Sequence, residues 1–183
     1  VSRFYSGPGD LVAAISSALN AAGLDRATLR PADLAPVDEF HIRGRAASLE
    51  IVEARGLTAH SRVLDLGSGL GGPARTLAEV TGCTVTGIDL TSEFCEVARV
   101  LSEWTGLTDR TRFHVGDATA TGLPDATVDA ALTVHVAMNI SDKPALYADI
   151  SDVIEIKPDG RRPYPTQLRE PPHIPSTQNA PAL

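Results

Sequence analysis

The sequence predicts an α/β fold, a doubly wound parallel sheet with helices on both faces. Short apolar runs, suited to buried strands, alternate with longer amphipathic runs, suited to helices, from residue 62 onward. The run 62–66 also leads directly into a glycine-rich turn, residues 67–72, which is followed by Pro73. Glycine permits a tight turn, and proline suits a first helical turn because no N–H is needed there. A strand, a turn and a helix in this order form the first half of a βαβ unit.

The segment 1–56 predicts a helical cap or lid in front of the core. Residues 8–22 place apolar side chains at helical spacing. Residues 24–40 contain two prolines and predict a connecting loop. Residues 42–54 predict a second helix, which Gly56 ends.

The segment 57–160 predicts the core that binds a cofactor. Its expected elements are, in order, strand 62–66, helix 73–81, strand 84–89, helix 92–104, strand 111–115, strand 128–134 and helix 143–156. Parallel strands of such a sheet bring their carboxyl ends to one edge, where ligands bind. We therefore expect the functional residues directly after the strands.

The segment 161–183 predicts an irregular tail. It holds six of the 13 prolines and no periodic apolar pattern, and proline cannot donate a hydrogen bond within a sheet. We therefore expect no further strand here. The strand 128–134 would then form an exposed sheet edge, through which the chain could associate as a homodimer.

Composition limits the partners and the compartment. The formal net charge is −7 and the isoelectric point is about 5.1, which argues against nucleic acid or an acidic membrane as partner. No apolar run approaches the roughly 20 residues of a membrane span, and no signal peptide is recognisable, so we expect a cytoplasmic protein. Cys83 and Cys95 lack the spacing of metal ligands, and we expect reduced thiols and no metal.

The glycine turn predicts a nucleotide-like cofactor. Gly67, Gly69 and Gly72 match the spacing G-x-G-x-x-G, and Asp89 ends the next strand 22 residues after Gly67. An acid at that distance is placed to bind a ribose. Asp65, two residues before the turn, would repel a pyrophosphate but attract a cationic ligand. These features favour a positively charged nucleoside over a dinucleotide.

The chain resembles the class I S-adenosylmethionine-dependent methyltransferases, in the type 11-like branch that acts on small molecules. The resemblance covers about residues 40–160 and is carried by residues 63–71, 87–90, 116–118 with 123–124, 128–130 and 156–160. It implies a Rossmann-like fold, S-adenosyl-L-methionine as cofactor and methyl transfer to nitrogen, oxygen or carbon of a small molecule. In that family a fifth strand follows the turn at 157–160 and the sheet has seven strands. The tail departs from this pattern, so we expect a truncated or frame-shifted enzyme that lacks the C-terminal strands.

The same resemblance assigns roles to individual residues. Those expected at the cofactor are Arg43, Asp65, Gly67, Ser68, Gly69, Asp89, Leu90, Asp117, Ala118 and His135. Those expected at the reacting groups are Tyr5, as an aromatic lid, His135 and Asn139. Three alternatives remain open: Arg43 as a solvated surface residue, His135 as a structural histidine, and Asp117 as a cap at a strand end.

Three other functions remain open from the sequence. An NAD-dependent oxidoreductase would share the glycine turn and Asp89, although Asp65 argues against it. A catalytically impaired fragment would bind the cofactor without turnover, because the C-terminal strands build part of the substrate wall in the resembling family. An interaction module would use the exposed sheet edge. The sequence does not identify the methyl acceptor.

Overall fold

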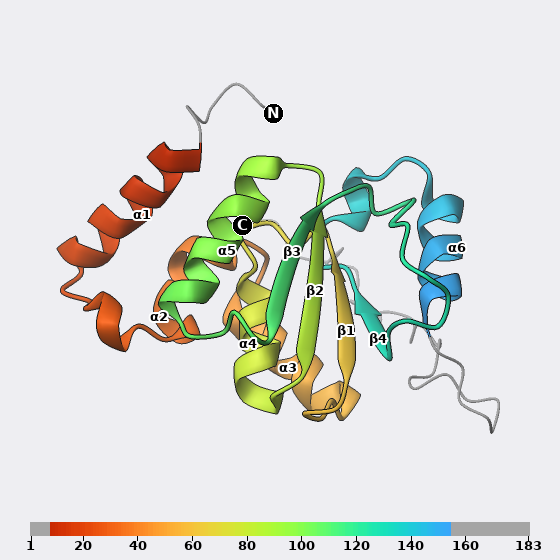
Figure 1. Ribbon diagram of the computed structural model, residues 1–183, viewed down its shortest axis with the longest axis horizontal. Helices are drawn as coiled ribbons and strands as arrows, with labels where there is room; N and C mark the ends of the chain where they lie inside the picture. Colours follow the sequence, from red (N-terminus) through yellow and green to blue (C-terminus); the bar gives the residue numbers. More distant parts are fainter. Residues whose placement is uncertain (1–7, 155–183) are drawn as a thin grey trace, which may run out of the picture.

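A computed structural model describes residues 8–154, with side chains from residue 11 onward (Figure 1). The predictions for Tyr5, for the turn at 157–160 and for the tail 161–183 lie outside these residues. So does the predicted loss of the C-terminal strands. Within the described part, the sheet lies between α5 and α6 and is flanked by helices on both sides (Figure 1).

The sheet has four strands within the described residues. They are β1 (Arg62–Leu66), β2 (Thr84–Asp89), β3 (Thr111–Val115) and β4 (Ala130–Leu132). Their order is β3-β2-β1-β4, and every pair is parallel. The predicted parallel α/β fold is confirmed. Because all strands run the same way, the turns after them meet at one edge of the sheet.

Helices cover both faces of the sheet. The helices α4 (Gly72–Thr81) and α5 (Ser92–Trp104) pack on the face that carries Val63, whereas α6 (Lys143–Val153) packs on the face that carries Leu64 and Leu66. Successive side chains of a strand point to opposite faces. Asp65 therefore shares the face of Val63, toward α4 and the N-terminal segment.

The last predicted strand is shorter than expected. Only Ala130–Leu132 pair with β1, instead of residues 128–134. The amide of Val128 donates a hydrogen bond of 3.0 Å to the Val153 carbonyl at the end of α6. Val128 therefore pairs with the end of this helix and not with β1. Within the described residues, β1 is the only strand that pairs with β4, and dimerisation through the β4 edge stays a prediction.

The N-terminal segment is more helical than expected. It contains α1 (Pro8–Ala21), a one-turn 3₁₀ helix (Arg26–Thr28), α2 (Pro31–Asp38) and α3 (Arg45–Arg55). The predicted loop over 24–40 is wrong, because α2 lies within it. Pro31 opens α2 and Asp33 accepts a hydrogen bond of 2.9 Å from the amide of Arg30, which is a typical helix start. Leu34 is fully buried, so packing stabilises the helix despite its internal Pro36.

A buried ion pair joins this segment to the core. The guanidinium of Arg75 on α4 is fully buried and donates a hydrogen bond of 2.8 Å to the Asp38 carboxylate at the end of α2. It also donates to the carbonyl of Ala98 at 3.0 Å and to that of Leu70. Gly72 permits the close approach, because a Cβ there would lie 2.5 Å from the backbone oxygen of Asp38. The segment before α3 is therefore fixed against the start of α4.

Among residues 8–154, none of the helices is long and apolar enough to cross a membrane. Cys83 and Cys95 are both free and buried, and burial raises the pKa of each thiol. This placement agrees with the predicted structural thiols.

Candidate functional site

The glycine turn follows β1 and leaves an open surface at Gly69. Gly67, Gly69 and Gly71 have φ values of +75°, +52° and +80°, a backbone region that favours glycine. A Cβ at Gly67 would overlap the side chain of Val136, which belongs to the loop after β4. A Cβ at Gly69 would meet nothing within 4 Å. Gly67 therefore packs against a neighbouring loop, whereas Gly69 leaves room beside it.

Asp89 at the end of β2 is held beside this turn. Its carboxylate accepts hydrogen bonds of 2.9 Å from the amides of Gly69 and Thr91. Two backbone donors thus fix the side chain at the edge where the strands end. The next residue, Leu90, is 73% exposed. The ribose contact of Asp89 and the adenine contact of Leu90 stay predictions.

Asp65 is a buried carboxylate without an ion-pair partner in the described part of the chain. Its exposure is 1%, and its Oδ2 atom has no hydrogen-bond partner among the described residues. Burial, together with the charges of Asp89 and Glu39, raises the pKa of Asp65 to about 7. Ser68 Oγ is likewise buried without a partner. Buried polar atoms in proteins are nearly always satisfied, so these two atoms suggest a ligand with hydrogen-bond donors.

Glu39 and His41 belong to the same corner of the molecule. The carboxylate of Glu39 is buried and accepts hydrogen bonds from Ser48 Oγ at 2.5 Å and from Thr76 Oγ1 at 2.7 Å. His41 Nε2 lies 3.2 Å from Glu39 Oε2, at ion-pair distance but without hydrogen-bond alignment. The rings of His41 and His135 are 6.0 Å apart, and they tilt by 43°. The two histidines are thus close in space although 94 residues separate them in the sequence.

The loop after β4 carries His135 and Asn139. His135 is exposed and has a φ of +56°, which is uncommon for a residue with a side chain. The residues Ala137–Asn139 form one turn of 3₁₀ helix. Met138 on the same loop is 68% exposed. The roles of His135 and Asn139 toward a substrate stay predictions.

Arg43 points to a partner on α3. Its guanidinium donates to the Glu50 carboxylate through Nη1, at 2.7 Å, and through Nη2. The side chains of both residues are more than half exposed. The structure therefore gives Arg43 a surface ion pair, and the predicted contact with a cofactor carboxylate is untested.

Asp117 closes the turn after β3. Its Oδ1 atom accepts hydrogen bonds of 2.8 Å from the amide and the hydroxyl of Thr119, and these bonds lower the pKa of this exposed carboxyl group. Ala118 is buried with Leu64 and Leu66. This geometry matches the alternative of a cap at the strand end, and contact with adenine stays a prediction.

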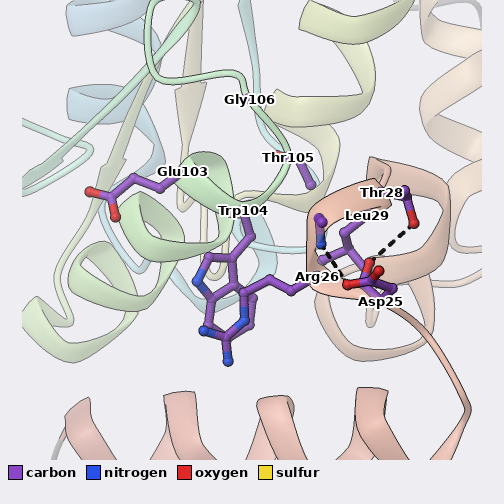
Figure 2. Close-up of a pocket in the computed structure, with 9 residues that line it drawn as sticks. Asp25, Arg26, Thr28, Leu29, Glu103, Trp104, Thr105 and Gly106 are labelled. Carbon is purple, nitrogen blue, oxygen red and sulfur yellow. Dashed lines mark hydrogen bonds between the residues drawn. The ribbon is translucent and has the colours of Figure 1, made fainter.

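Two hollows lie on the described surface. One, of about 370 Å³, is apolar and adjoins the glycine turn; its lining includes Leu11, Ala14, Phe40, Gly69 and Phe94. The other, of about 880 Å³, lies where Arg26 stacks over Trp104, with 4.4 Å between the guanidinium carbon and the ring centre (Figure 2). None of the predicted site residues lines the larger hollow.

Metal ligands were not expected in this chain. Within residues 8–154, no group of three or more His, Cys, Asp or Glu side chains is placed to hold a metal ion.

Sequence reasoning missed Glu39 and His41 as members of this corner. The run from Asp38 to Ile42 contains two acidic residues and is typical of a solvent-exposed loop. The burial of Asp38 and Glu39 depends on Arg75 and Thr76, which lie more than 30 residues away. No local sequence pattern predicts that Asp38 pairs with Arg75 or that Glu39 pairs with Thr76.

Comparison with known proteins gives one family. The methyltransferase domain family matches residues 63–160, which is more than half of the chain. A sterol 24-C-methyltransferase of Gibberella zeae is 32% identical over 105 residues, which cover 57% of this chain and 27% of that protein. The methyltransferase GfsG of Streptomyces halstedii is 30% identical over 129 residues, 70% of this chain and 46% of that one. The chain spans less than half the length of these relatives.

Solved structures resemble the same region. The MccD protein superposes with a TM-score of 0.61 over 64% of this chain and 52% of that chain, at 17% identity, which shows the fold alone. A phosphoethanolamine N-methyltransferase 2 of Haemonchus contortus, solved in complex with S-adenosyl-L-methionine, has a TM-score of 0.56 and 26% identity. The superposition covers 60% of this chain and 26% of that one.

Proposed function

The chain belongs to the methyltransferase domain family, and from this we propose that it binds S-adenosyl-L-methionine and transfers the methyl group to a small-molecule acceptor. The relatives named above are methyltransferases, and one similar protein was solved with this cofactor bound. The bound cofactor would supply a methyl group that is already activated by a sulfonium. The residues of this chain then need to bind, orient and exclude water.

The observation that carries the proposal is the buried Asp65. A carboxylate with an unpartnered oxygen, two residues before the glycine turn, suits the ammonium group at the methionine end of this cofactor. The same carboxylate would repel the pyrophosphate of NAD. Asp65 therefore favours a methyltransferase over the oxidoreductase alternative.

The surrounding residues fit the rest of the cofactor. Asp89 is fixed by two backbone amides beside Gly69, where a ribose hydroxyl would donate to it. The open space beside Gly69 leaves room for the nucleoside backbone. His135 and Asn139 stand on the loop after β4, whose Val136 touches Gly67, and they would face the methyl acceptor.

Calorimetry with S-adenosylhomocysteine and with NAD tests the proposal. We expect S-adenosylhomocysteine to bind and NAD to give no heat at the same concentration. The variant Asp89→Ala should weaken S-adenosylhomocysteine by about 1 to 3 kcal/mol, the usual cost of unmet buried polar groups. Binding of NAD in preference would support the oxidoreductase, and absence of both would refute a cofactor site.

Turnover separates an enzyme from a fragment that only binds. The protein is incubated with S-adenosylmethionine labelled at the methyl group and with a mixture of small amines, phenols and alcohols. We expect the label to appear in an extractable product. Binding of S-adenosylhomocysteine without transfer to any acceptor would favour the catalytically impaired alternative.

A further inference from the structure

The proposed cofactor poses a charge problem at this site. Its methionine end carries an α-carboxylate as well as an ammonium group. The buried side chains described around the glycine turn include the carboxylates of Glu39 and Asp65, and the half-buried carboxylate of Asp89 is near enough to raise the pKa of Asp65. A carboxylate brought among these groups needs a cation or hydrogen-bond donors to bind it.

The arginines near the site are already engaged. Arg43 is paired with Glu50 on the surface of α3. Arg45 donates to Thr76 at 2.6 Å and to Glu79 at 2.7 Å. Arg75 is fully buried and holds Asp38. Each would have to break an ion pair before it could hold a ligand.

His41 is placed differently. Its side chain is only 6% exposed, and its Nε2 lies beside the Glu39 carboxylate. The ring faces that of His135, which precedes Val136, the residue packed on Gly67. Glu39 in turn is near enough to raise the pKa of Asp65. His41 therefore stands at the corner where Asp65 would take the ammonium group.

We propose that His41, whose Nε2 lies 3.2 Å from Glu39, donates a hydrogen bond to the α-carboxylate of the cofactor. This inference rests on the proposed function and adds a residue to its site. In the ligand-free structure Nε2 is not aligned to donate to Glu39, and Nδ1 lies 3.4 Å from the carbonyl oxygen of Ile42. A turn of the ring would present one of its N–H groups to the ligand.

The segment that carries His41 is anchored at its start before any ligand binds. Asp38 is held by the ion pair with Arg75, and Glu39 by hydrogen bonds from Ser48 and Thr76. An anchored backbone loses less freedom on binding than a free loop, which favours a specific contact.

A pair of ligands tests this contact directly. S-Adenosylhomocysteine carries the carboxylate, and its decarboxylated form, S-adenosyl-3-thiopropylamine, keeps the adenosine, the sulfur and the amine. Calorimetry on the full chain should show that S-adenosylhomocysteine binds about tenfold or more tightly than the amine. In the variant His41→Asn that ratio should fall close to one, mainly through weaker binding of S-adenosylhomocysteine.

His60→Asn is the matched control, because His60 is exposed in the turn before β1, at the opposite end of the strand. It should keep the wild-type ratio. If His41→Asn weakens both ligands by the same factor, or neither, the proposal is overturned. If Arg43→Gln collapses the ratio and His41→Asn does not, Arg43 is the carboxylate partner. Should the wild type bind neither ligand, the proposed function itself has failed.

Discussion

We expect Asp65 to couple cofactor binding to pH. With a pKa of about 7, half of the ligand-free molecules hold this group protonated at neutral pH. Because an ammonium group binds the ionised form, the affinity for S-adenosylhomocysteine should rise between pH 6 and pH 8. The ratio of wild-type to Asp65→Asn affinity isolates this residue from other titrating groups, and calorimetry at several pH values measures it. A ratio that stays constant would remove Asp65 from the binding site.

Two glycines of the turn should respond differently to substitution. A Cβ at Gly72 would lie 2.5 Å from the Asp38 backbone oxygen, so Gly72→Ala should cost about 3 kcal/mol or more of unfolding free energy through overpacking. At Gly69 nothing lies within 4 Å, and Gly69→Ala should cost only the roughly 1 to 2 kcal/mol of a left-handed residue. Urea denaturation of both variants measures the difference. Equal losses would contradict the packing role of Gly72.

Site residues that belong to a local sequence pattern could be predicted. Asp65, Gly67 and Gly69 follow from a strand that ends in a tight turn, and each lies at that turn in the structure. Glu39 and His41 were not predictable as site residues, because their burial depends on partners from α3 and α4. Arg43 shows the converse, since a plausible cation near the turn is paired with Glu50 instead.

At the scale of elements, the Asp38–Arg75 pair should be a major link between α2 and α4. Asp38→Asn leaves a fully buried guanidinium without its counter-charge, which costs about 3 to 5 kcal/mol. Its matched control is Glu50→Gln, which breaks the exposed pair with Arg43 and should cost less than about 1 kcal/mol. Chemical denaturation compares the two. Similar small losses from both would show that α2 does not depend on the ion pair.

The element boundaries show which signals are reliable. Strands β1, β2 and β3 and helix α5 fall at their predicted residues, because strong apolar runs and glycines mark their limits. Helix α2 was missed because two prolines favoured a loop, whereas Pro31 opens the helix and Leu34 anchors it. Strand β4 is shorter than its apolar run because Val128 pairs with the end of α6.

At the scale of the whole molecule, the burial of the Asp65 carboxyl group lowers stability at neutral pH. Its pKa is raised from 3.8 to about 7 on folding, so the folded state binds the extra proton between these values. The contribution of Asp65 to stability therefore falls as pH rises from about 4 to 7. The unfolding free energy of Asp65→Asn minus that of the wild type should therefore be roughly 2 to 4 kcal/mol larger at pH 8 than at pH 4.5. Thermal unfolding of both proteins at the two pH values checks this; a difference independent of pH would contradict it.

The buried contact between Asp38 and the start of α4 also limits how this protein can be recombined with its relatives. A chimera that takes its first 56 residues from another methyltransferase would place a foreign α2 against Gly72, Arg75 and Thr76. Unless the donor supplies an acid at the position of Asp38, the graft would bury a lone guanidinium. The N-terminal helices and α4 are therefore better exchanged together, so that both members of the buried ion pair come from the same protein.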